Sequence, residues 1–156
     1  MIVNKHALIV ILTTIFLSPC DSNETSAKLS EVEMLSSYGA NIKAFEQITT
    51  LGLEKLGDKK LMIIGDSDQY IDHLSEAEIK KYKLLLKDSG AKRVTINKED
   101  PKYPVVSFLV NSSGLVTGGC SSEIIFSYLT PKQPEWADLY IYYKFNRKWH
   151  GVTNCN

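Results

Sequence analysis

The sequence predicts an α+β fold, in which N-terminal helices pack on a C-terminal antiparallel β-meander of about four to five strands. Residues 30–90 hold two amphipathic stretches with helix-capping signals, whereas residues 92–153 hold short runs rich in β-branched and aromatic residues. Turn residues separate these runs by short connections, so we expect neighbouring strands to be antiparallel. The length of 156 residues suits one domain, for which we expect the bounds 29–156.

Residues 1–20 have the parts of a secretory signal peptide. Lys5 gives a basic start, the eleven-residue run Ala7–Leu17 is apolar apart from two threonines, and small residues follow it. Such a run is too short for a permanent membrane span, which needs about 20 residues. Residues 21–28 are small and polar, which predicts a flexible tether between this leader and the domain.

The last four residues of the leader, Leu17-Ser18-Pro19-Cys20, resemble the lipobox of bacterial lipoproteins. In that class the cysteine is lipidated and becomes the first residue of the mature protein. The resemblance therefore implies a lipid anchor to the membrane at Cys20 and a location in the periplasm or cell envelope. Pro19 departs from the pattern, in which that position usually holds a small residue.

The cysteine count agrees with this resemblance. The chain has three cysteines, Cys20, Cys120 and Cys155. If Cys20 carries lipid, the other two can pair in an oxidising compartment without leaving a free thiol. We therefore expect a Cys120–Cys155 disulfide, the alternative being two unpaired buried cysteines. Closing a loop of about 36 residues would stabilise the fold by about 3–4 kcal/mol in the chain-entropy model.

A capping box marks the start of the first predicted helix. Ser30 precedes Glu33 by three residues, and Gly57 is a suitable stop. Between them, apolar residues recur three or four positions apart, as on one face of an amphipathic helix. We expect this stripe to face the core: Leu35, Tyr38, Ile42, Phe45 and Ile48.

The second predicted helix has the clearest signals in the chain. Ser75 and Glu78 form another capping box, and Gly90 provides the stop. Before this helix, the apolar run Leu61–Ile64 is too short to assign by periodicity.

The C-terminal half predicts the strands. Asn111–Gly114 is a candidate hairpin turn, and Gly118-Gly119 in the returning strand indicates a bulge, a bend or a close approach to the backbone. The predicted strands are 92–97, 105–110, 115–128 (interrupted by the two glycines), 139–145 and 148–153.

The strand over residues 139–145 provides a candidate binding surface. Alternation places Leu139, Ile141, Tyr143 and Phe145 toward the core. The opposite face carries tyrosines, and large aromatic side chains dominate interface hot spots. The alternative is that helices cover this face or that the tyrosines line a half-exposed sheet. The candidate binding residues are Trp136, Tyr140, Tyr142, Lys144, Trp149, Gly118 and Gly119.

The charge balance and the missing motifs restrict the function. With 18 basic and 18 acidic residues the chain has no net charge, so it lacks the basic excess of most nucleic-acid-binding proteins. No zinc-binding spacing, Cys-x-x-Cys pair or glycine-rich phosphate loop occurs, and we expect no metal, no cofactor and no catalytic residue. The leading hypothesis is a small exported envelope protein that binds another protein. By analogy, it would be an immunity or inhibitor protein that blocks a toxin or enzyme.

Two other functions stay open. The first is a small envelope hydrolase or ligand-pocket protein that uses His73 or His150 with a nearby acid, such as Asp66, Asp72 or Glu123. The second is a structural envelope lipoprotein, which would have neither an aromatic binding surface nor such a pocket.

Overall fold

The computed structural model describes residues 28–114 and 118–156. The predicted signal peptide, Cys20 and the tether up to residue 27 lie outside the described residues. The α+β class and the antiparallel sheet are confirmed. No helix within the described residues is both long and apolar enough to cross a membrane. The elements are α1 (Glu31–Leu56), β1 (Leu61–Ile64), α2 (Glu76–Ser89), β2 (Arg93–Asn97), β3 (Val105–Ser113), β4 (Cys120–Phe126), β5 (Leu139–Lys144) and β6 (Trp149–Cys155).

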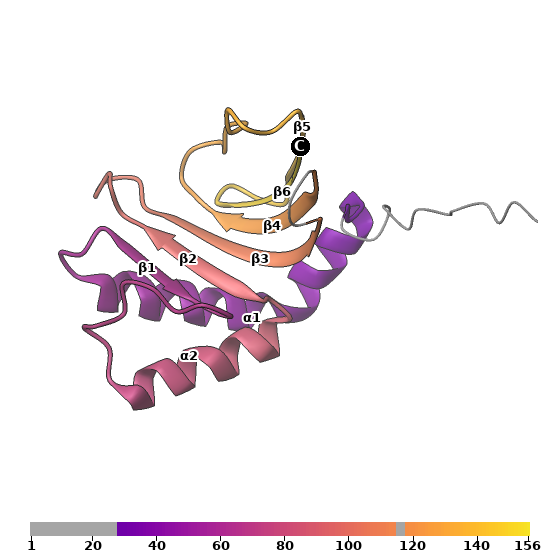
Figure 1. The fold of residues 1–156 in the computed structure, drawn as a ribbon. Coiled ribbons are helices and arrows are strands. Elements are labelled where there is room, and N and C mark those ends of the chain that lie inside the picture. The colour runs from indigo at the N-terminus through magenta and orange to yellow at the C-terminus, as the bar shows by residue number, and fades with distance from the viewer. Residues whose placement is uncertain (1–27, 115–117) are drawn as a thin grey trace, which may run out of the picture.

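The sheet has six strands in the order β1-β2-β3-β4-β6-β5, and all neighbours are antiparallel (Figure 1). The expected number of four to five strands was therefore too low, and β1 lies between the two helices rather than after them. Its four residues are too few to show a period, and pairing with β2, in which Met62 lies opposite Ile96, defines it as a strand. The sheet is not a simple meander, because β6 lies between β4 and β5.

Both helices begin at the predicted capping boxes. At the start of α1 the backbone N–H of Ser30 donates a hydrogen bond to the Glu33 carboxylate at 2.8 Å. At the start of α2 the backbone N–H of Ser75 donates to the Glu78 carboxylate in the same way. Gly90 ends α2 in the left-handed conformation, as its position predicted.

The core face of α1 differs by one position from the prediction. Met34 is fully buried, whereas Leu35 is 48% exposed, because the face that meets the sheet passes through Met34, Tyr38 and Phe45. The helix continues through Gly52, where an added Cβ would overlap Cδ1 of Ile96. This glycine allows α1 to approach β2 closely.

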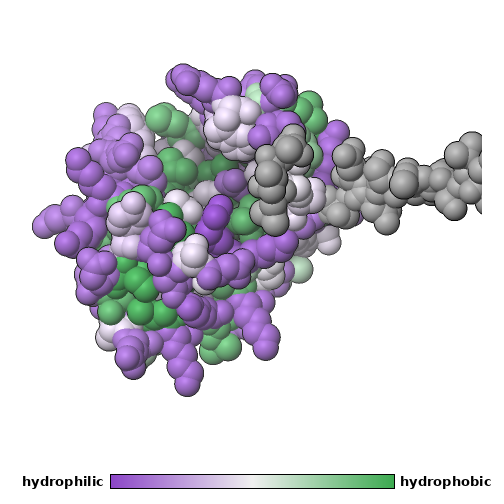
Figure 2. Space-filling view, in the orientation of Figure 1, coloured by the Kyte–Doolittle hydropathy of each residue, from purple (hydrophilic) through white to green (hydrophobic). Residues whose placement is uncertain are grey.

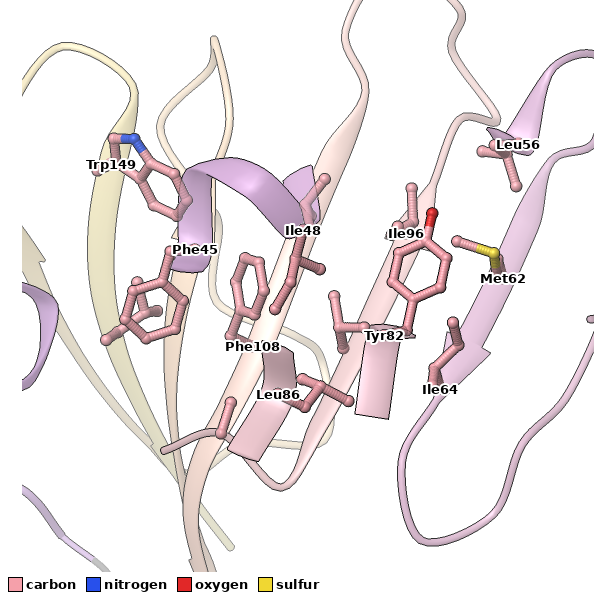
Figure 3. Close-up of a cluster of buried hydrophobic side chains, with 14 of the residues drawn as sticks. Phe45, Ile48, Leu56, Met62, Ile64, Tyr82, Leu86, Ile96, Phe108 and Trp149 are labelled. Atoms are coloured by element: carbon pink, nitrogen blue, oxygen red, sulfur yellow. The ribbon is translucent and has the colours of Figure 1, made fainter. Parts of the chain in front are cut away.

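Aromatic rings fill the core between α1 and the centre of the sheet (Figure 3). Phe45 packs edge-on against Phe108 with ring centroids 4.9 Å apart, and Tyr38 stacks on Phe145 at 5.1 Å. Trp149 joins them and is only 5% exposed. It therefore does not belong to the candidate binding surface, because it starts an interior strand and faces the helices.

The outermost strand β5 is less buried than its alternation predicted. Leu139, expected in the core, is 41% exposed. The residues that follow it are half-buried, including both Ile141 and Tyr142 from opposite faces. An edge strand has only one neighbouring strand, here β6, so its inward side chains are covered less completely than those of central strands.

The β3–β4 hairpin is longer than predicted. Strand β3 runs through the expected turn to Ser113, with a register shift between Leu109 and Asn111. Gly114 has a φ of 70°, whereas residues 115–117, expected to begin the returning strand, lie between the described ranges. At Gly119 an added Cβ would overlap the carbonyl oxygen of Ser113. The close approach predicted at Gly118-Gly119 is thus made by the chain itself.

A disulfide joins Cys120 and Cys155, as the cysteine count predicted. The two residues are direct register partners at the ends of β4 and β6, with Cα atoms 4.1 Å apart. The C-terminus is therefore fixed to the middle of the sheet.

Candidate functional site

The face of the sheet opposite the helices contains the candidate site. Both α1 and α2 lie on one side of the sheet, and no helix of the described residues covers the other side (Figure 1). The connection from β4 to β5, residues 127–138, arches over this helix-free face. A cavity of about 390 Å³ lies between the connection and the sheet. Figure 2 shows hydrophobic side chains recessed beneath this arch, with hydrophilic side chains around them.

Strands β3, β4 and β6 form the floor of the cavity. Their alternation directs one set of side chains to the helices and the other to the cavity, and the register places Glu123 opposite Val152. The floor combines an apolar surface with a few polar groups. It consists of Val105, Ser107, Glu123, Ile125, Val152 and Asn154.

The β4–β5 connection forms the roof. Pro131 and Pro134 contribute apolar rings, and the exposed side chain of Lys132 also lines the space. Trp136 lines the cavity but remains 55% exposed, so its ring stands at the mouth. Of the predicted binding residues, it is the one that the structure places in the wall of this cavity.

The predicted surface tyrosines hold the roof in place. Tyr140 donates its hydroxyl hydrogen to the carbonyl oxygen of Pro131 at 2.6 Å. Tyr142 lies 2.9 Å from Nδ1 of His150, whose Nε2 lies 3.3 Å from the carbonyl oxygen of Ser127. Both tyrosines are half-buried. They act as supports between the sheet and the connection rather than as an open aromatic surface.

These contacts also define the protonation of His150. A carbonyl oxygen can only accept, so Nε2 carries a proton, and in the neutral ring Nδ1 accepts from the Tyr142 hydroxyl. Burial of the ring lowers the pKa of His150 below its ordinary value of 6.5, and nearby Lys144 lowers the pKa further, whereas the contact with Ser127 opposes the shift. The lowered pKa therefore keeps the imidazole mainly neutral at pH 7.

Two residues with acceptor groups line the floor of the cavity. Asn154 is 6% exposed, and its Oδ1 is buried without a hydrogen-bond partner among the described residues. The Glu123 carboxylate accepts a hydrogen bond from the hydroxyl of Ser107. The ion pairs found in the described residues, Lys55–Glu78 and Lys83–Asp68, do not include Glu123.

The other predicted residues are dispersed. Lys144 is exposed at the end of β5, and Gly118 and Gly119 lie at the β3–β4 hairpin, where Gly119 pairs with the backbone of Asn156. Sequence reasoning missed Ser107 and Asn154, and it named Glu123 only as an acid for the hydrolase alternative. Ser107 stands out as a polar residue in the apolar run of β3, but the sequence did not show which face of the sheet would be free of helices.

Neither histidine of the described residues forms a hydrogen bond or ion pair with an acid, although His73 shares a hollow with Asp72. His150 instead contacts the hydroxyl of Tyr142 and the carbonyl oxygen of Ser127. His73 lines a separate hollow with Asp72, and its Nε2 is buried without a partner there. Within the same ranges, no group of three or more His, Cys, Asp or Glu side chains could hold a metal ion.

Comparisons with known proteins found no relative of this chain. No family model matches the chain, and no curated protein or solved structure is similar to it. The function must therefore be inferred from the geometry of the cavity and its surroundings.

Proposed function

We propose that the mature protein is an exported binding protein that is anchored in the cell envelope through lipid on Cys20 and receives its partner at the cavity on the helix-free face. One observation carries this proposal: a largely apolar hollow with a few polar groups lies beneath a roof that hydrogen bonds already hold in place. Binding sites are commonly preformed hollows of this kind. A fixed roof also reduces the conformational entropy lost on binding.

The proposed partner is another protein. Eight large hydrophobic side chains are exposed in the described residues, and four of them lie between positions 128 and 139. A concentration of exposed apolar side chains beside polar ones is typical of an interaction surface. The four are Tyr128, Leu129, Trp136 and Leu139. By analogy, the protein would be an immunity or inhibitor protein that blocks a toxin or enzyme in the envelope.

The partner can be sought by site-specific crosslinking in the native host. A photoreactive residue, p-benzoylphenylalanine, would replace Glu135, which is exposed beside Trp136 and leaves that ring intact. The matched control carries the same residue at Leu84, which is 60% exposed on α2 at the other side of the molecule (Figure 1). We expect a discrete crosslinked protein from position 135 but not from position 84.

Competition makes this experiment decisive. Excess purified wild-type domain should abolish the crosslink, whereas the Trp136→Ala domain should compete at least about tenfold less well, because truncated hot-spot residues cost about 2 kcal/mol or more. Equal crosslinking from both positions, or equal competition by the two domains, would contradict a partner at the cavity.

The location has its own test, the intact mass of the mature protein from its native host. A chain that begins at Cys20 and carries acyl groups is expected. A mature chain that begins beyond Cys20 without lipid would overturn the anchor but not the binding role.

A further inference from the structure

The buried amide of Asn154 indicates what kind of group the cavity receives. Its side chain lines the cavity, is 94% buried and has an Oδ1 without a donor among the described residues. A buried acceptor that lacks a hydrogen bond is unfavourable. Because Oδ1 itself has almost no exposed surface, the Asn154 side chain must turn toward the cavity before an N–H group of a ligand can supply the missing bond.

Glu123 adds negative charge to the same cavity floor. Strands β4 and β6 are neighbours, and both side chains project from their shared cavity face. The hydroxyl of Ser107 supplies the carboxylate with one hydrogen bond, whereas a carboxylate can accept about four. Neither ion pair found among the described residues involves Glu123. The floor can therefore accept several further hydrogen bonds from one cationic group.

The remaining lining suits the rest of such a ligand. Trp136 stands at the mouth, and the face of an indole ring attracts a cation. Val105, Ile125 and Val152 give the floor an apolar surface, on which the methylene stem of a lysine or arginine side chain can pack.

We infer that the cavity binds a positively charged nitrogen group, an alkylammonium or guanidinium, with Glu123 and Asn154 as its acceptors and Trp136 at its entrance. The inference rests on the proposed function, because it assigns the chemistry of the group that enters the same cavity. Two sources can present this chemistry: a lysine or arginine side chain of a protein partner, or a free small amine.

Lys132 provides a test of the sign of the ligand charge. Its exposed side chain lines the roof and would repel a cation, whereas an anion would pair with it. Lys132→Gln should therefore bind a cationic probe severalfold more tightly, with the difference shrinking as salt is added. An anionic ligand would bind this variant more weakly.

The experiment uses the purified, disulfide-bonded domain and NMR titration of the Trp136 indole and the Asn154 side-chain amide. The probes are Nα-acetyl-lysine and Nα-acetyl-arginine methylamides, 1,5-diaminopentane as a free amine, and the uncharged Nα-acetyl-citrulline methylamide. We expect both cationic amino-acid probes to shift these signals, with Kd values of about 1 mM for so small a ligand, and the citrulline probe to bind at least about tenfold more weakly.

Glu123→Gln supplies the main variant, and Glu135→Gln is its matched control. Both remove one negative charge, but Glu135 is exposed and does not line the cavity. We expect Glu123→Gln to weaken binding of the cationic probes about tenfold or more, and Glu135→Gln to change it less than twofold. Native-like spectra of both variants would exclude misfolding as the cause.

The outcomes test the cation inference and the protein partner separately. Equal effects of Glu123→Gln and Glu135→Gln, or equal binding of the charged and neutral probes, would overturn the cation inference while leaving a crosslinked partner at position 135 intact. Tight binding of the diamine, without a crosslinked protein, would support the cation chemistry with a free amine as its source and overturn the protein partner. Loss of the position-135 crosslink in the Glu123→Gln chain would assign the cation to the protein partner.

Discussion

The hydroxyl of Tyr142 lies 2.9 Å from Nδ1 of His150, across neighbouring strands of the helix-free face. The other ring nitrogen of His150 meets the carbonyl oxygen of Ser127 at the start of the β4–β5 connection. A side chain that the sequence suggests for a binding surface therefore stabilises the roof of the cavity. Burial favours the neutral imidazole, in which Nδ1 accepts from the Tyr142 hydroxyl while Nε2 donates to Ser127.

Stability should consequently decrease in mild acid. The pKa of His150 is lowered in the folded state, mainly because the ring is buried, so the unfolded chain binds a proton at higher pH than the folded protein does. The stability that the neutral ring provides is complete above the ordinary value of 6.5 and is lost as the pH falls through 6.5 toward the lower folded pKa. Urea unfolding from pH 8 to pH 5 would measure this loss. In His150→Gln the free energy of unfolding should change less between pH 8 and pH 5. An unchanged pH dependence would contradict the role assigned to His150.

The cross-strand disulfide should contribute a large part of the stability. Replacing both Cys120 and Cys155 by alanine is expected to lower the free energy of unfolding by about 3–4 kcal/mol, because a covalent link restricts the unfolded chain. Reduced wild-type protein should unfold at nearly the same denaturant concentration as the double variant. Equal stability of the oxidised and reduced wild-type protein would show that the bond does not stabilise this fold.

Replacing either of two glycines in α1 by alanine should have opposite effects on the stability of the protein. At Gly39 an added Cβ meets nothing within 4 Å, so Gly39→Ala should stabilise the protein by about 0.5–1 kcal/mol through helix propensity. At Gly52 the Cβ would overlap Ile96, which is fully buried, so Gly52→Ala should destabilise by about 1–3 kcal/mol. Chemical denaturation of the two variants measures both effects. Stabilisation by Gly52→Ala would contradict the close helix–sheet approach.

The cap of α2 should matter more than the ion pair that joins this helix to α1. Ser75→Ala removes the acceptor for the backbone N–H of Glu78 and should cost about 1 kcal/mol. The Lys55 ammonium lies 2.7 Å from the Glu78 carboxylate, but both side chains are substantially exposed, so Lys55→Ala should destabilise the protein less than Ser75→Ala does. Thermal unfolding of the two variants would compare them. A larger loss in Lys55→Ala would show that the ion pair is the stronger contact.

Local signals determined much of this fold. Ser30 with Glu33 and Ser75 with Glu78 defined both helix starts, because a capping box is formed by residues within one turn. The pairing of Cys120 with Cys155 followed from counting, since the resemblance at Cys20 left two cysteines.

The sequence by itself thus determined the class of the fold, the helix ends, most strands and the disulfide, while tertiary structure decided the site. Alternation gave each strand two faces, but only packing decided that Trp149 would lie in the core and Trp136 at the mouth of a cavity. The insertion of β6 between β4 and β5, which brings Asn154 beside the strand of Glu123, likewise depends on contacts between distant segments. The physical reason is that hydrogen-bonding and periodicity signals act over a few residues, whereas the choice of which sheet face the helices cover depends on how the whole chain buries its apolar surface.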